Sequence, residues 1–417
     1  MNATPRTGPA EVSAEVLAGP SAEAVEQAAA LLQGVAVRTP LEESRWLSQV
    51  AGGPVYLKAE NLQRAGSFKI RGAYVRMARL SPEERARGVV AASAGNHAQG
   101  VALAAQLLGI RSVVYMPNGA PLPKEKATRG YGAEVRFSGT TVDEALVSAR
   151  RYAEETGAVL VHPFDHPDVV AGQATCGLEL LEQCPSVRTV IVPTGGGGLL
   201  AGVATVVKRA RPDVRVVGVQ AEGAAAYPAS LESGYPQALT TMTTMADGIA
   251  VGCPGEVPFA AVREHVDEFV TVDEEALSQA LLMVLERMKL VVEPAGAVGV
   301  AAVTQWPDRF ETPAVVVLSG GNVDPLLLMN VIRHGLVAAG RYLDFHVAIP
   351  DRPGGLARLL GELAEVEANV LEVVHERTSA DLHLGEVAVG LQVETRGPEH
   401  AERVLGHLRG RGYGVTT

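Results

Sequence analysis

The sequence of 417 residues predicts a mostly parallel α/β protein with a small α+β domain at its C-terminus. In the first 340 residues, strand-like apolar runs alternate with helical patterns, which is typical of parallel sheets with helical crossovers. Several of these runs are apolar throughout, as expected for a sheet that is covered on both faces. After Gly340 the pattern changes to β-α-β-β-α-β, the order of a ferredoxin-like domain.

The elements of the larger part follow in order along the chain. Residues 1–20 mix Pro, Gly, Ala, Ser and Thr, which predicts a flexible N-terminal extension. Ser21 suits the N-cap of a first helix. The predicted strands are Val55–Leu57, Val89–Ala91, Ser112–Tyr115, Glu134–Phe137, Val159–Val161, Thr189–Val192, Arg215–Gln220 and Ala314–Leu318. The helices predicted between them include Ala98–Leu108, Thr141–Glu155 and Glu274–Met288.

The C-terminal part has its own short elements. Its predicted strands are Phe345–Ile349, Val370–Arg377, Gly385–Thr395 and Tyr413–Thr416, and its predicted helices are Leu356–Glu367 and Glu399–Arg409. The domain boundaries that follow are an extension at 1–20, a main region at 21–340 and a small domain at 341–417.

Charge and cysteine content exclude several classes of function. The net charge of −11 argues against broad nucleic-acid binding and against an anionic membrane surface. Three cysteines without a CxxC pair fit a reducing compartment, so we expect a cytoplasmic protein. Thr189–Val207 is uncharged, but Pro193 and four glycines interrupt it. It therefore predicts a strand, a turn and a helix start rather than a membrane span.

The segment Ser67–Ala73 carries a lysine between two apolar residues. Phe68 and Ile70 could desolvate the Lys69 amine, which would lower its pKa and leave a neutral nucleophile. By itself the segment favours a surface lysine at the start of a helix.

Two further segments follow predicted strands and open helices. Ser93–Gly100 offers polar side chains and free backbone N–H groups, which suit a carboxylate as well as an ordinary helix cap with a buried histidine. Gly195–Leu199 begins with four consecutive glycines, which allow backbone N–H groups to converge on a phosphate. It lacks the lysine of a nucleotide-binding P-loop, so a simple phosphate group is the better fit.

Ser319 directly follows the strand Ala314–Leu318, at the sheet edge where open α/β sheets bind ligands. An amine, a carboxylate site, a phosphate turn and a hydroxyl are thus all expected at strand ends. Pyridoxal-5′-phosphate (PLP) with an amino acid needs all four. The combination is far more specific than any one motif.

These segments, together with Glu293–Ala297, Asp247–Ala250 and Pro163–Asp165, resemble threonine dehydratases (threonine ammonia-lyases) of the fold-type II, tryptophan-synthase-β-like PLP class. The resemblance covers roughly Ala24 to Val337. It implies two mostly parallel subdomains, the smaller at about 64–160 inserted in the larger. It also implies β-elimination of L-threonine, or of L-serine, to a 2-oxo acid and ammonia, a first step toward isoleucine.

The resemblance assigns roles residue by residue. Lys69 corresponds to the lysine that holds PLP as a Schiff base and removes the Cα proton. Phe68 would lie against the cofactor, Asn96 would bond its phenolic oxygen, and Gly195, Gly196, Gly197, Gly198 and Leu199 would cradle its phosphate. Ser319 would face the pyridine nitrogen without holding it protonated, which favours prompt elimination. The substrate carboxylate would meet Ser93, Gly95 and His97.

Serine racemases share this scaffold but use a second serine at the position of Ala94. Without that group, protonation of the opposite face is unsupported, and the lyase is favoured. Related enzymes also bind a divalent cation, and Glu222 matches its first ligand. Tyr227 and Pro228 stand near the second, so no metal is expected and Glu222 stays doubtful.

Phe345–Thr417 resembles an ACT domain through the turn Asp351–Leu356. This implies an amino-acid effector, and inhibition by isoleucine with antagonism by valine is the leading hypothesis. Asn369 lies where ligands are contacted in that family. A scaffold for a homodimer or homotetramer is the alternative. Serine dehydratase, serine racemase, threonine synthase and a non-catalytic amino-acid sensor remain open alternatives for the whole chain.

Overall fold

The computed structural model describes residues 19–377 and 385–416. The chain divides into two compact units, Met1–Asp324 and Pro325–Thr417. The predicted N-terminal extension falls outside the described residues, except for its last two residues, which are buried.

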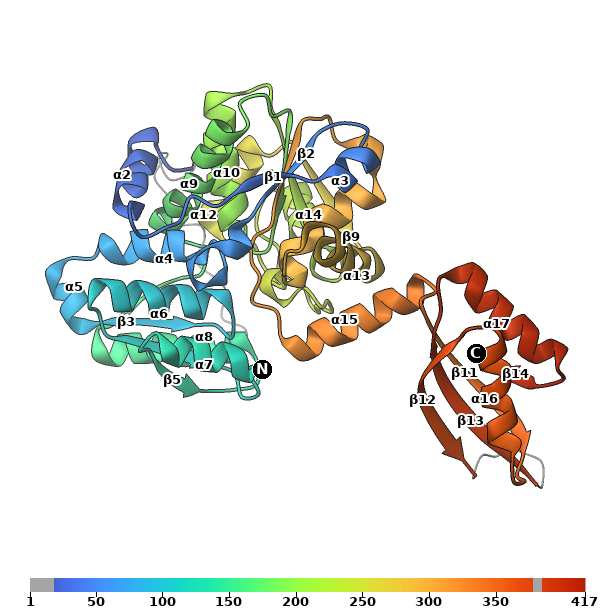
Figure 1. Cartoon of the computed structure of the whole chain (residues 1–417). Coiled ribbons are helices and arrows are strands. Elements are labelled where there is room, and N and C mark those ends of the chain that lie inside the picture. Colours follow the sequence, from blue (N-terminus) through green and yellow to red (C-terminus); the bar gives the residue numbers. More distant parts are fainter. Residues whose placement is uncertain (1–18, 378–384, 417) are drawn as a thin grey trace. The chain divides into compact units, whose positions relative to one another are not determined.

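A six-stranded sheet forms the larger part of the first unit (Figure 1). Its order is β1-β2-β10-β7-β8-β9, and every pairing is parallel except that of β1 with β2. The strands are β1 (Leu41–Glu43), β2 (Val55–Lys58), β7 (Thr189–Pro193), β8 (Arg215–Ala221), β9 (Glu268–Val272) and β10 (Ala314–Val317). The sequence pattern missed only the two edge strands. β1 is short and largely exposed, and β9 is buried at only two positions, so neither forms an apolar run.

A second, fully parallel sheet lies in the chain between β2 and β7. Its order is β5-β4-β3-β6, with β3 (Val89–Ala92), β4 (Ser112–Met116), β5 (Glu134–Phe137) and β6 (Val159–Leu160). In Figure 1, β3 lies between α6 (Asn96–Leu108) and α8 (Val142–Thr156). Alternate residues of β3 join the apolar clusters on the two sides. Cover on both faces explains why this strand is apolar throughout.

Helix α9 (Pro167–Gln183) packs against both α4 (Lys69–Ala78) and α10 (Gly198–Ala210). The predicted N-cap of α2 (Ala22–Leu32) is confirmed, because the Ser21 hydroxyl accepts from the Ala24 N–H at 3.1 Å. The predicted helix Glu274–Met288 is α13 (Glu274–Met283) continued by a π-helical turn, Val284–Met288. The remaining helices of this unit are α3 (Arg45–Val50), α5 (Pro82–Arg87), α7 (Leu122–Gly130), α11 (Ala226–Ser233), α12 (Glu256–His265) and α14 (Pro294–Gln305).

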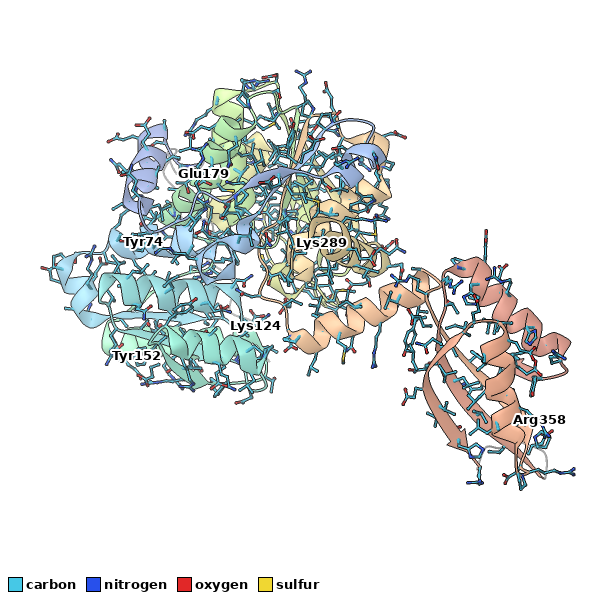
Figure 2. The ribbon with its side chains drawn as sticks, in the orientation of Figure 1. Tyr74, Lys124, Tyr152, Glu179, Lys289 and Arg358 are labelled. Carbon is cyan, nitrogen blue, oxygen red and sulfur yellow. The ribbon has the colours of Figure 1, made fainter. Side chains whose placement is uncertain are left out.

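A buried charge network fixes the start of α4. Arg71 is 1% exposed and bonds Glu60, itself fully buried, through two contacts of 2.8 Å. It also reaches Glu179 on α9 (labelled in Figure 2) at 2.7 Å. Glu179 in turn accepts from Lys58 at 2.6 Å. Burial alone would raise the pKa of Glu60, but the attraction of Arg71 and its hydrogen bonds lower the pKa below the usual value. The network therefore holds β2, α4 and α9 in one arrangement.

The second unit has the predicted β-α-β-β-α-β order, preceded by α15 (Pro325–Ala338). Its elements are β11 (Tyr342–Pro350), α16 (Gly355–Glu365), β12 (Asn369–Glu376), β13 (Glu386–Glu394), α17 (Pro398–Gly410) and β14 (Gly414–Thr416). The four strands form an antiparallel sheet in the order β12-β13-β11-β14. The two helices pack on it through Leu359, Val404 and Leu408, as in a ferredoxin-like domain.

The uncharged segment Thr189–Val207 consists of β7, the glycine turn and most of α10, as its glycines predict. Among the helices that the structure describes, none is long and apolar enough to cross a membrane. Cys176 and Cys184 are buried in the apolar cluster beneath α10.

Candidate active site

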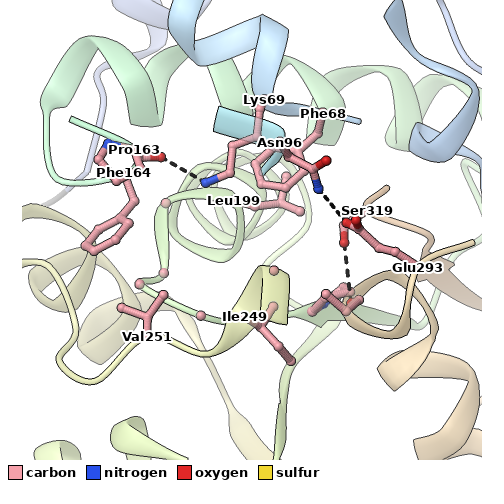
Figure 3. Close-up of a pocket in the computed structure, with 17 residues that line it drawn as sticks. Phe68, Lys69, Asn96, Pro163, Phe164, Leu199, Ile249, Val251, Glu293 and Ser319 are labelled. Atoms are coloured by element: carbon pink, nitrogen blue, oxygen red, sulfur yellow. Dashed lines mark hydrogen bonds between the residues drawn. The ribbon is translucent and has the colours of Figure 1, made fainter. Parts of the chain in front are cut away.

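One pocket gathers the motifs that lie far apart in the sequence (Figure 3). It is lined by Lys69 at the start of α4, Asn96 at the start of α6, the glycine turn before α10 and Ser319 after β10. The space measures about 510 Å³, open solvent at its mouth included. The glycine turn and Ser319 follow β7 and β10 of the six-stranded sheet, and Asn96 follows β3 of the four-stranded sheet, so the pocket combines strand ends of both sheets.

The Lys69 amine points into this pocket rather than to the surface (Figure 3). Its Nζ donates to the carbonyl of Pro163 at 3.0 Å and lies 5.1 Å from the centre of the Phe68 ring. Burial lowers the pKa of Lys69 to about 8, although the nearby Glu293 acts in the opposite direction. A useful fraction of the amine is thus neutral near physiological pH, as a nucleophile or base requires. The reading of Lys69 as a surface lysine is excluded.

The glycine turn Gly195–Gly198 lines the pocket, and neighbouring side chains leave no room for a Cβ at Gly196 or Gly197. A Cβ on Gly196 would lie 2.5 Å from the Phe164 ring. Gly197 has a φ of +96°, and a Cβ there would lie 1.8 Å from the hydroxyl of Tyr227. The N–H groups of the first turn of α10 have no partner within the helix, so this end is suited to an anion.

Two side chains with buried polar groups complete the pocket. Ser319 is 4% exposed, and its hydroxyl lies 3.5 Å from the carbonyl of Ala295. Glu293 is 2% exposed, and its Oε1 accepts from Asn96 Nδ2 at 2.5 Å. Burial, and then repulsion from Asp247, raise the pKa of Glu293 to about 7. The sequence marked Glu293 only as part of a family motif. The structure adds that Glu293 is buried and hydrogen-bonded to Asn96, which the motif did not reveal.

The residues expected at the substrate carboxylate, Ser93, Gly95 and His97, do not line this pocket. The Ser93 hydroxyl accepts from the Gly95 N–H at 3.1 Å and so closes a tight turn. His97 is buried with Nε2 2.8 Å from the carbonyl of Val161. Burial, reinforced by Lys69, lowers the pKa of His97 to about 3, so the ring is neutral.

Lys124 is a further charged group that the sequence did not single out (Figure 2). It is 7% exposed and comes from α7, and its amine bonds Asp247 at 2.6 Å. The same amine would lie 3.9 Å from a Cβ on Gly95. A buried positive charge thus stands beside the Ser93–Gly95 turn. No periodic pattern or motif in the sequence pointed to it.

Glu222 begins a short 3₁₀ turn after β8. Within the described ranges it belongs to no group of three or more His, Cys, Asp or Glu side chains that could hold one ion. The neighbouring Tyr227 is fully buried, stacks on Phe269 at 4.8 Å and donates to the carbonyl of Gly196 at 3.3 Å. Tyr227 therefore supports the glycine turn from behind.

The donor groups of the pocket fit a phosphate-bearing aldehyde. The helix start with its glycines suits the phosphate, and a partly neutral lysine amine suits the aldehyde. Asn96 offers N–H groups to a ring oxygen, and Phe68 offers an apolar wall. Fold and pocket together define an enzyme site for a cofactor of the pyridoxal-phosphate type.

Comparison with known proteins agrees with this class. The family model described as pyridoxal-phosphate dependent enzyme matches residues 32–320. The chain belongs to this family, and its cofactor is PLP.

Similar proteins with curated names are threonine-deaminating enzymes. L-threonine ammonia-lyase of Thermotoga maritima is 49% identical over 94% of this chain and 98% of its own length. Catabolic L-threonine dehydratase of Staphylococcus aureus is 45% identical over 75% of this chain and 92% of its own length.

Solved structures resemble the catalytic part. A threonine deaminase from T.th. is 44% identical with a TM-score of 0.70, and the match covers 73% of this chain and 99% of the other. Maize serine racemase is 35% identical with a TM-score of 0.72, and the match covers 77% of this chain and 99% of the other.

Proposed function

We propose that this protein is a PLP-dependent ammonia-lyase that converts L-threonine to 2-oxobutanoate and ammonia. The relatives named as L-threonine ammonia-lyases support this substrate, because they are 48–49% identical over at least 90% of the chain. The observation that carries the proposal is the Lys69 amine, placed in one pocket with the glycine turn and Asn96.

The pocket residues divide the work between binding and proton transfer. Gly195–Leu199 would hold the cofactor phosphate, Phe68 would pack on the ring, Asn96 would bond its oxygen and Ser319 would face its nitrogen. When bound, PLP supplies the sink for negative charge at Cα. Lys69, with its lowered pKa, removes the Cα proton. The β-hydroxyl would leave as water after a nearby acid protonates it, and hydrolysis of the remaining enamine would release ammonia and the 2-oxo acid.

For the substrate carboxylate we propose the turn Ser93–Gly95 together with His97, which is buried in the first turn of α6. Free backbone N–H groups at the start of α6 suit an anion. The Lys124 amine stands beside this turn and adds positive charge.

Replacing Lys69 with alanine tests the central assignment. We expect loss of the absorbance of lysine-bound PLP and loss of 2-oxobutanoate formation, measured by absorbance and by a coupled dehydrogenase assay. A Lys126→Ala variant, which removes a lysine that does not line the pocket, should keep both. Retention of either property in the Lys69 variant would refute the assignment.

Serine racemisation is the second candidate, because a serine racemase is among the similar structures. Ala94 offers no group that could protonate the opposite face of the substrate. We therefore expect pyruvate but no D-serine from L-serine, measured by chiral chromatography. A steady yield of D-serine would favour the racemase. The kcat/KM values for L-threonine and L-serine decide the substrate preference, since one methyl group discriminates by only about 1–3 kcal/mol.

For the second unit we propose an ACT-like regulatory role in isoleucine biosynthesis. The ammonia-lyase of Thermotoga maritima aligns with 94% of this chain, whereas the catabolic dehydratase aligns with 75%. The additional share of the chain is similar in size to the second unit, Pro325–Thr417. Asn369, predicted near the effector, is exposed and donates to Glu394 at 3.3 Å. Isoleucine should inhibit and valine should oppose it, in activity and thermal-shift titrations. If neither isoleucine nor valine changes the activity or the melting temperature, the second unit would serve only as a scaffold for assembly.

The proposal includes a homodimer or homotetramer located in the cytoplasm. Sedimentation of the holoenzyme, with and without isoleucine, measures the assembly. A monomer under both conditions would contradict it.

A further inference from the structure

The amide of Asn96 is held by a hydrogen-bond chain that runs through three loops. Asn322 Nδ2 donates to the carbonyl of Ala65 at 2.7 Å and to Asn96 Oδ1 at 2.8 Å. Asn96 Nδ2 then donates to Glu293 Oε1 at 2.5 Å. Both polar atoms of Asn96 are thereby hydrogen-bonded within the protein.

The direction of this chain is fixed by chemistry at its first link. A backbone carbonyl can only accept, so the nitrogen of Asn322 must face Ala65. Because the same nitrogen contacts Asn96, the facing atom of Asn96 must be its oxygen. The other atom of Asn96 is then the NH₂ group, and only one of its two hydrogens is used by Glu293. A flipped Asn96 would oppose two NH₂ groups and set its oxygen against the carboxyl of Glu293.

Close packing keeps the partners in register. A Cβ on Gly320 would lie 2.4 Å from Glu293 Oε1 and 3.0 Å from Asn96 Nδ2. A Cβ on Gly66 would lie 2.3 Å from Asn322 Oδ1. Gly66 precedes Lys69 by three residues, so the loop that carries the lysine also anchors the chain. A carboxyl as buried as that of Glu293 is costly, which is consistent with a specific task.

We propose that Glu293 and Asn322 are positioning residues that turn a free N–H of Asn96 toward the ring oxygen of PLP. The proposal rests on the proposed function, because it needs PLP bound beside Asn96. The N–H stabilises the ionised ring oxygen, and the flipped amide would oppose that charge with a carbonyl oxygen. The two positioning residues thus bias the bound cofactor toward the form with an ionised oxygen.

The test compares absorbance spectra of purified holoenzymes with L-threonine absent. Glu293→Leu removes the acceptor for Asn96. Asn322→Asp replaces the donor with a carboxylate and so favours the flipped amide. In both variants we expect the ratio of the ionised-oxygen band to the protonated-oxygen band to fall on the order of tenfold, the worth of a charged hydrogen bond. Glu293→Gln keeps an acceptor oxygen and should retain the ratio of the unsubstituted enzyme.

The controls separate positioning from general damage. Asn330→Asp makes the same change of charge at an exposed residue of α15 and should leave the ratio unchanged. If Asn322→Asp does not fold, Glu293→Leu perturbs Asn96 from the other side. If Glu293→Leu and Asn322→Asp both form lysine-bound PLP and keep the band ratio of the unsubstituted enzyme, the positioning role is refuted and the proposed function stands. The positioning role is also refuted if the band ratio falls as far in Glu293→Gln as in Glu293→Leu. If the unsubstituted protein forms no lysine-bound PLP, the proposed function itself fails.

Discussion

Removing Arg71 tests whether the buried charge network holds the catalytic unit together. The substitution Arg71→Met keeps the apolar stem but removes the group that bonds Glu60, Glu179 and Thr175 at 2.7–3.1 Å. Glu60 is fully buried and would keep only its bond to Thr39 and the more distant attraction of Lys58. Leaving a buried charge without its partner costs about 3–5 kcal/mol. At about 2 °C per kcal/mol in a unit of this size, the melting temperature should fall by about 6–10 °C.

The pH dependence of this loss identifies its cause. In the unsubstituted protein the folded-state pKa of Glu60 is lowered, so its stabilisation is present above the ordinary pKa and is lost as the pH falls. Without Arg71, burial dominates and raises the pKa, so the folded state is penalised as the pH rises. The difference in melting temperature should therefore be larger at pH 8 than at pH 5.

Arg38→Met is the matched control. Arg38 bonds Glu182 at 2.7 Å, but the two side chains are 55% and 61% exposed. Such a pair contributes about 0–1 kcal/mol. Differential scanning calorimetry at one heating rate should therefore show a clearly lower melting temperature for Arg71→Met than for Arg38→Met. Equal losses in Arg71→Met and Arg38→Met, or a loss in Arg71→Met that does not depend on pH, would refute the reasoning.

Two further predictions concern the pocket. Gly197→Ala should weaken PLP binding about tenfold or more, since its φ of +96° and the hydroxyl of Tyr227 1.8 Å away both oppose a Cβ. The control is Gly109→Ala, because Gly109 has a φ of +66° but open space around it and should not affect PLP binding. Equal PLP affinity in the two variants would contradict the prediction for Gly197. The rate at which the apoprotein captures PLP should rise with pH around a midpoint near 8, because only the neutral Lys69 amine reacts. Stopped-flow absorbance measures that rate, and a midpoint above 10 would mean that the amine is not desolvated.

The chemistry of the pocket was readable from the sequence wherever it is concentrated in short segments. Short segments predict a local geometry in three places: at the four glycines, at the lysine between Phe68 and Ile70, and at Ser319 after an apolar strand. The strands of the interior were equally clear, because burial on both faces demands an apolar run. The edge strands β1 and β9 lacked this demand and were missed.

Residues whose role depends on a distant partner gave no such signal. Lys124 bonds Asp247, which lies 123 positions along the chain, and the hydrogen bond from Asn322 to Asn96 joins residues 226 positions apart. The segment around His97 suited a carboxylate and a buried histidine equally, and the fold buries His97 with Nε2 2.8 Å from the carbonyl of Val161. No pattern within one helix or strand encodes these pairings.

Local patterns in the chain were thus enough for the α/β class, the ferredoxin-like order of the last unit, and a set of groups suited to PLP. The folded arrangement was needed to learn that Lys69 is desolvated, that Glu293 is buried beside Asn96, and that Arg71 is tied to Glu60 and Glu179. The reason is physical. Periodicity and turn chemistry act over a few residues, whereas burial, pKa and hydrogen-bond direction depend on atoms that meet only once the sheets have formed.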